Sequence, residues 1–77
     1  MDNAVIKYVV EFTQTGLFLM PSNNVNKLPY AKLFNTHVEA VSAATWKQVN
    51  VTTDAYFSEY RAFCIHEVLV EEGVALL

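Results

Sequence analysis

The sequence is poor in the residues that form covalent cross-links, metal sites and phosphate-binding loops. Its 77 residues include one cysteine, two glycines and two prolines. One cysteine cannot form an intrachain disulfide or a closed cysteine-rich zinc site. The two isolated glycines cannot form a glycine-rich phosphate loop, and no P-loop or G-x-S-x-G motif occurs. We therefore expect no cofactor and no metal, and a chain suited to a reducing cytoplasm.

Basic residues are also few, with five Lys and Arg against eight Asp and Glu and a formal net charge of −3. The basic residues are scattered singly, so the sequence shows no basic stripe for a phosphate backbone. The first residues, MDNAVIKYVV, contain no basic segment followed by a long apolar run, and no stretch is long enough to span a bilayer. These absences argue against nucleic-acid binding, secretion and membrane insertion.

Apolar residues, in contrast, are abundant for so short a chain. Hydrophobic residues make up 53% of the sequence and aromatic residues 13%, which is enough for a packed core and argues against disorder. The length predicts a single domain, residues 1–77. A domain of this size buries only about 60% of the surface that its unfolded chain exposes. Part of the apolar surface is therefore expected to be covered by a partner or a second copy.

Two segments have the alternating pattern of strands. In residues 5–12, VIKYVVEF, β-branched and aromatic residues recur with period two. Gly16 can adopt a positive φ angle in a short turn, so residues 5–20 predict a β-hairpin. Residues 62–71 alternate in the same way, and we expect this last strand to pair with the first.

The segment between these strands predicts a loop, a strand and a helix. Residues 22–29 are rich in loop-forming residues, and residues 30–34, YAKLF, are interpreted as a third strand. Thr36 and Glu39 fit a capping box, in which each side chain bonds the other residue's amide. The helix that follows has valines along one stripe and small residues beside it, which let it lie close to a sheet. These residues are Val38, Val41, Thr45 and Val49, with Ala40, Ala43 and Ala44, and with Trp46 at the flank.

The remaining segments give weaker signals. Residues 54–60 are interpreted as a short second helix or an irregular turn, and residues 74–77, VALL, as an apolar tail. The whole order predicts an α+β domain: a small, mostly antiparallel sheet of about four strands, with one main helix packed on one face.

The sequence resembles small uncharacterised proteins encoded by bacteriophages and related mobile elements. The likeness rests on KYVV, a Thr-Gly hairpin, A-x-L-F-x-T-x-x-E-A before a helix, and I-H-E-V-x-V-E near the end. The resemblance implies a β-β-β-α-β layout, and a protein that binds and blocks host or defence proteins. Because these motifs describe architecture, they identify no functional residue.

Few residues could carry catalysis. Cys64 and His66 lie on one face of the last predicted strand, where a thiolate–imidazole pair or half a metal site can be imagined. A lone cysteine is more often a small packing residue, and His37 is interpreted as a solvated first-turn residue of the helix. The carboxylates are interpreted as solvated charges, because general acid–base catalysis needs a cleft that shifts one pKa. We therefore expect that the protein is not an enzyme.

The expected function is binding to a host protein, which is inhibited or redirected by steric occlusion through a sheet face or edge. The sequence leaves a homodimer open as a second expectation. A regulator or accessory factor of phage DNA metabolism, and a small structural component, are the alternatives. The candidate interface residues combine aromatic anchors with a charged rim, and they are Tyr56, Phe57, Tyr60, Arg61, Glu67 and Glu71.

Overall fold

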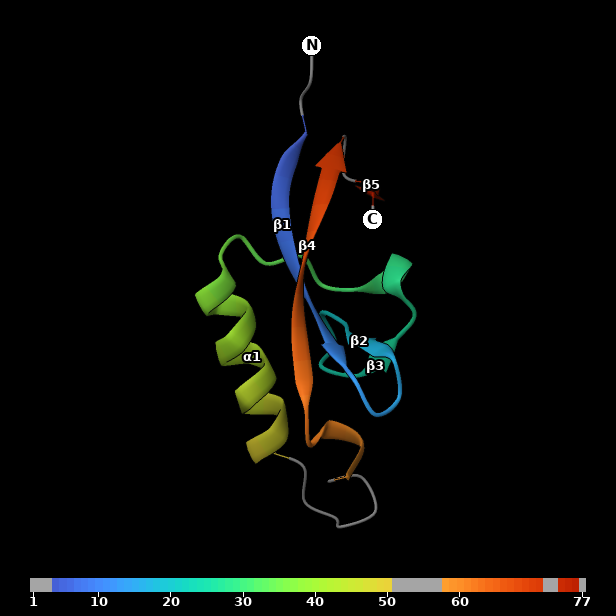
Figure 1. Ribbon diagram of the computed structural model, residues 1–77, viewed down its shortest axis with the longest axis vertical. Coiled ribbons are helices and arrows are strands. Elements are labelled where there is room, and N and C mark those ends of the chain that lie inside the picture. The colour runs from blue at the N-terminus through green and yellow to red at the C-terminus, as the bar shows by residue number, and fades with distance from the viewer. Residues whose placement is uncertain (1–3, 51–57, 72–73, 77) are drawn as a thin grey trace.

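The computed structural model describes residues 4–50, 58–71 and 74–76 (Figure 1). Within these residues, five strands form one antiparallel sheet in the order β3-β2-β1-β4-β5. The strands are β1 (Val5–Phe12), β2 (Leu17–Leu19), β3 (Val25–Asn26), β4 (Phe63–Glu71) and β5 (Val74–Leu76). The described helices are α1 (His37–Val49) and the short 3₁₀ helices η1 (Leu28–Tyr30) and η2 (Ser58–Tyr60). The predicted α+β class, with one main helix on an antiparallel sheet, is confirmed.

Strand β1 is the centre of the sheet. It pairs with β4 along its whole length, from Val5 opposite Val70 to Phe12 opposite Phe63. On its other side a four-residue turn leads into β2, and the amide of Gly16 donates to the carbonyl of Phe12 at 2.8 Å. Gly16 has φ +72°, a left-handed conformation that glycine adopts without steric cost. The predicted hairpin and the pairing of the last long strand with the first are both confirmed.

The prediction of a third strand at residues 30–34 is wrong. Residues 28–30 form η1, because Pro29 occupies its first turn, where a fixed φ and a missing N–H are tolerated. Within residues 30–34, Phe34 forms an isolated bridge in which its N–H and carbonyl bond Tyr8 at 2.8 and 2.9 Å, and the Lys32 amide donates to the carbonyl of Leu19 at 2.8 Å. The third strand is instead Val25–Asn26, inside the predicted surface loop, where Val25 pairs with Leu19.

The start of α1 follows the predicted capping box in part. Thr36 is the N-cap, and its hydroxyl accepts from the amide of Glu39 at 3.1 Å. The Glu39 carboxylate accepts from the amide of Asn35 at 3.1 Å, and not from that of Thr36 as predicted. The extended backbone at Thr36 (φ −134°, ψ 156°) presents the Asn35 amide to the carboxylate. The first bond satisfies an amide that the first turn would otherwise leave without a partner, and the second satisfies the amide of the residue before the N-cap.

The helix packs on the sheet through its alanines. Ala40 and Ala44 are fully buried, whereas Val38 and Val49 are 73% and 75% exposed. Small side chains allow the helix backbone to approach the sheet closely, and this turns the valine stripe outward. Trp46 is 51% exposed, so about half of this large side chain remains in contact with solvent. The buried cluster on this face consists of Val10, Phe12, Leu19, Phe34, Ala40 and Ala44.

The opposite face of the sheet has a second, smaller buried cluster. Its members Val9, Val68 and Val70 are covered by η1 and the segment that follows it. Figure 1 shows this arrangement, with α1 on one side of β1 and β4 and η1 on the other. The partly buried residues that pack on this cluster are Phe18, Leu28, Ala31 and Leu33.

Two further segments, residues 74–76 and 54–60, are compared with their predictions. Residues 74–76, predicted as an apolar tail, form β5, which pairs antiparallel with β4 from Glu71 opposite Val74 to Leu69 opposite Leu76. The predicted helix or turn at 54–60 is described only at Ser58–Tyr60, where η2 is found. Residues 54–57 lie outside the described residues.

Candidate functional site

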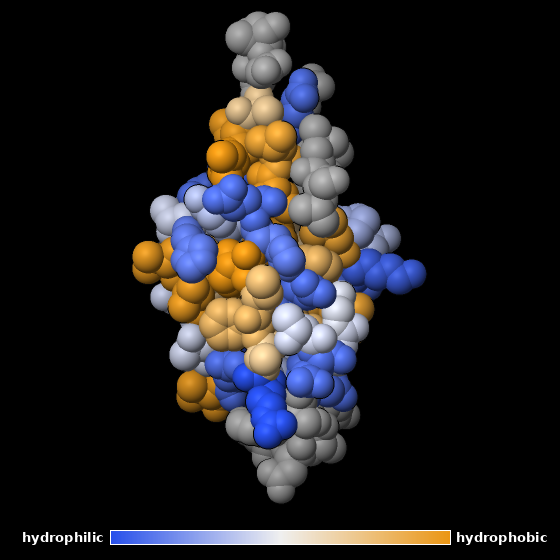
Figure 2. Space-filling view, in the orientation of Figure 1, coloured by the Kyte–Doolittle hydropathy of each residue, from blue (hydrophilic) through white to orange (hydrophobic). Residues whose placement is uncertain are grey.

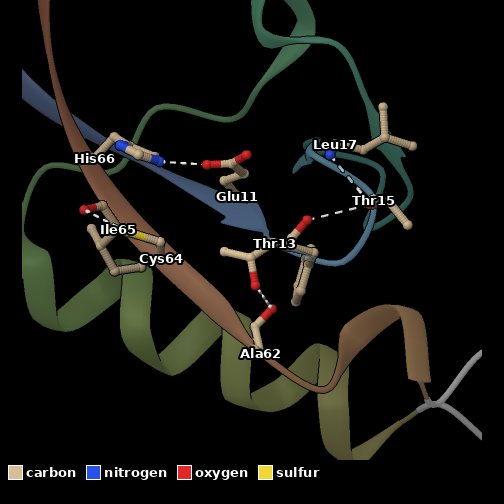
Figure 3. A network of polar contacts seen from close by, with 9 residues as sticks. Glu11, Thr13, Thr15, Leu17, Ala62, Cys64, Ile65 and His66 are labelled. Atoms are coloured by element: carbon tan, nitrogen blue, oxygen red, sulfur yellow. Dashed lines mark hydrogen bonds and ion pairs between the residues drawn. The ribbon is translucent and has the colours of Figure 1, made fainter.

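The polar contact that most resembles part of a catalytic site is a histidine–glutamate pair on the face of the sheet opposite α1 (Figure 3). The Nε2 atom of His66, on β4, lies 2.6 Å from Oε1 of Glu11, on β1. Their side chains are 37% and 26% exposed, and the His66 ring also contacts that of Phe18 at 6.1 Å between centroids. A pair this open to solvent contributes about 0–1 kcal/mol to stability. The geometry therefore fits a cross-strand surface contact.

Cys64 is neither paired with His66 nor the small packing residue that the sequence favours. Its side chain is exposed, and its thiol makes only a weak contact with the carbonyl of Ile65 at 4.0 Å. In the described part of the chain, no group of three or more His, Cys, Asp or Glu side chains is placed to hold a metal ion. His37 lies in the first turn of α1, where its ring and that of Tyr8 form a T-shaped pair with centroids 6.0 Å apart.

The aromatic candidates from the sequence separate into two groups. Tyr56 and Phe57 lie outside the described residues. Tyr60 is half-buried, and its ring meets that of Phe12 edge-on, with centroids 5.0 Å apart and planes at 86°. The Nζ atom of Lys47 lies 5.0 Å from the centroid of the same ring. These contacts give Tyr60 a packing role beside the helix.

The charged candidates lie in exposed positions at different places. Arg61 is exposed just before β4 begins. Glu67 and Glu71 are exposed on β4 itself, on the face that carries α1. This assignment follows from strand alternation, because Phe63 and Ile65 pack in the cluster under the helix. Arg61 and the two carboxylates therefore belong to different parts of the surface.

Strands β1 and β4 extend beyond the helix, and their uncovered part carries apolar side chains. Ile6 and Leu69 lie directly opposite each other and are 51% and 49% exposed. Tyr8, opposite Glu67, continues the same face and is half-buried. We refer to these residues as the tip surface, which consists of Ile6, Tyr8, Glu67, Leu69 and Glu71. Figure 2 shows an apolar area over the upper part of β1 and β4, with hydrophilic residues beside it.

Sequence reasoning found the carboxylates of the tip surface but missed its apolar centre. The period-two pattern places Ile6 and Tyr8 on one face, and Leu69 on the facing strand. The pattern does not show where the helix ends relative to the strands. Because the 13 residues of α1 lie beside only part of β1 and β4, the same face is core at Val10 and open at Ile6.

Among the described residues, no helix combines the length and the apolar character needed to cross a membrane. Comparisons of the chain with protein-family models, with curated proteins and with solved structures gave no match.

Proposed function

We propose that the protein is a small binding module that docks another protein on its tip surface, without catalysing a reaction. The observation that supports this most is the exposed pair Ile6 and Leu69, at the centre of an open sheet face. Covering these two half-exposed aliphatic side chains contributes about 2 kcal/mol from apolar burial. A further contribution comes from Tyr8, whose residue type is enriched at binding hot spots.

The proposed target is a protein of the host cell, in keeping with the resemblance of the sequence to small phage-encoded proteins. The module would inhibit or redirect this target by covering part of its surface. The single cysteine, Cys64, is free and exposed, which suits the reducing cytoplasm that we propose as the place of action.

The first experiment is an affinity pull-down of the tagged protein from nuclease-treated bacterial lysate, read by mass spectrometry. Light scattering on the purified protein accompanies it. One stoichiometric protein partner that survives nuclease is expected. Loss of all partners after nuclease, with nucleic acid recovered from untreated lysate, contradicts the proposal and favours a regulator of DNA metabolism. Recovery of the protein alone as a large assembly favours a structural component.

Matched variants connect any captured partner to the tip surface. Ile6→Thr and Leu69→Thr each remove apolar surface while keeping a residue type that strands accept. Val49→Thr makes a similar change at a side chain that is 75% exposed on the outer side of α1. We expect the first two variants to lose the partner and the third to retain it, with far-UV circular dichroism showing that all three are folded. Equal capture by all three variants would contradict the assignment of the surface.

A further inference from the structure

The charges on the tip surface are of one sign and lie on both sides of its apolar centre. Glu67, Leu69 and Glu71 are alternate residues of β4, so all three side chains lie on the same face. Both glutamates are exposed, and Leu69 between them is 49% exposed. Positions four residues apart in a strand are separated by about 13 Å. An apolar centre is thus flanked by two carboxylates at a defined spacing.

These carboxylates are not neutralised within the described part of the chain. Neither Glu67 nor Glu71 has a basic partner within 4.0 Å among the described residues. The nearby cation on β1, Lys7, lies on the opposite face by strand alternation and donates to Oδ1 of Asn35. Lys32 lies over Phe34, which is bridged to Tyr8, and Lys47 lies over Tyr60, next to the helix-side core. The two carboxylates of the tip surface therefore have no ion-pair partner among the described residues, and each is open to a basic group of a ligand.

Charge decides which kind of partner fits this surface. A second copy placed face to face on the tip surface would bring four carboxylates together around one apolar contact, which costs binding energy. A partner with basic side chains would instead form two opposite-charge pairs around the same contact. Building on the proposed function, we propose that the tip surface binds a segment of another protein in which an apolar side chain lies between two basic ones.

The spacing between Glu67 and Glu71 further defines the sequence pattern of the bound segment. In an extended segment, side chains at positions i, i+2 and i+4 point to one side and cover about 13 Å. Basic residues at i and i+4 match Glu67 and Glu71, and an apolar residue at i+2 rests on Ile6 and Leu69. The ligand class is therefore an extended peptide with the pattern basic-x-apolar-x-basic.

The probe is a fluorescent nine-residue peptide with Arg, Val and Arg at alternate positions of its centre and Ser elsewhere. A control peptide has Glu in place of both Arg residues. Fluorescence anisotropy gives the Kd of each peptide at low and at raised salt concentration. We expect the basic peptide to bind about tenfold or more tightly than the acidic one, with an advantage that shrinks as salt screens the charges. Equal affinities, or no binding of the basic peptide at a concentration of about 1 mM, would overturn the inference.

Charge reversal in the protein completes the test. The double variant Glu67→Lys/Glu71→Lys is expected to prefer the acidic peptide. Glu59→Lys, which makes the same type of change in η2 at the other end of the molecule, keeps the original preference (Figure 1). Unchanged preference in the double variant, with a normal circular dichroism spectrum, rejects the inference.

Failure of this inference can be distinguished from failure of the proposed function. If Ile6→Thr abolishes capture of the cellular partner but the double charge reversal does not, the binding module stands and the basic segment is rejected. If light scattering shows a dimer that Ile6→Thr dissociates, a second copy occupies the surface and both proposals fail.

Discussion

Replacing Phe12 and Tyr60 by leucine, singly and together, measures how much the contact between their rings contributes to folding. Phe12 is fully buried, and the two rings meet edge-on at 5.0 Å and 86°. Phe12→Leu keeps most of the apolar volume, so its expected cost is about 1–2 kcal/mol, below the ~3–5 kcal/mol typical of an alanine substitution. Tyr60→Leu also removes the ring beneath the Lys47 ammonium, a contact of about 0.5–1 kcal/mol at an exposed site.

The double variant isolates the ring–ring contact. An edge-on aromatic pair contributes about 0.5–1.5 kcal/mol beyond its buried area, so the double variant should be less destabilised than the sum of the single ones by this amount. A domain of this length has a free energy of unfolding of about 4–12 kcal/mol, so all three variants should still fold. Urea denaturation followed by far-UV circular dichroism gives the four free energies, provided that each transition is two-state.

The coupling energy has a direct consequence for the surface of the protein. A value within about 0.3–0.5 kcal/mol of zero, as found for independent sites, would show that the two rings do not stabilise each other. A clear coupling assigns this ring to the domain's own stability and leaves partner binding to other residues.

Three further substitutions test the local physical arguments by urea or thermal denaturation. Thr36→Ala should lower the free energy of unfolding by about 1 kcal/mol by removing the cap of α1, whereas Thr36→Ser should retain most of it; equal losses would exclude the hydroxyl as the cause. Gly16→Ala should cost about 1–2 kcal/mol from the backbone alone, because an added Cβ would meet its nearest neighbouring atom at an ordinary 3.8 Å. A neutral effect would mean that the turn readily adopts another conformation. Ala44→Leu should cost about 1–3 kcal/mol because Ala44 is fully buried and the larger side chain would overpack the core. The exposed Ser42→Leu should change stability by less than about 0.5 kcal/mol, and a similar loss in both would show that the helix does not pack through its alanines.

The features that could be predicted from the sequence depend on residues close to one another or on a strong repeating pattern. The hairpin follows from period-two alternation around Gly16, and the helix start follows from Thr36 and Glu39. The last long strand pairs with the first because each has an alternating pattern of similar length. These signals lie within a few residues or along a whole strand, so reading the sequence recovers them.

The features that could not be predicted depend on contacts between distant segments. Val25 and Asn26 carry no strand signal of their own, and they pair with β2 only because the chain turns back there. Residues 30–34 have a strand-like composition, yet η1 and the following segment are needed to cover Val9 and Val68. In the same way, tertiary packing selects the alanines of α1 over its valines. The open part of the tip surface depends on where the helix lies, which periodicity does not encode.

The pairing of β1 with β4 also determines when the protein can fold during its synthesis. Val5 pairs with Val70 and Phe12 with Phe63, so the partners are 65 and 51 positions apart. A nascent chain that has released β1, β2 and α1 still lacks the strand that completes the centre of the sheet. Its β1 edge and the buried cluster beneath the helix stay open until the last residues of β4 emerge from the ribosome. Because these distant pairings dominate the sheet, the domain is expected to fold only once β4 is available, in one cooperative step.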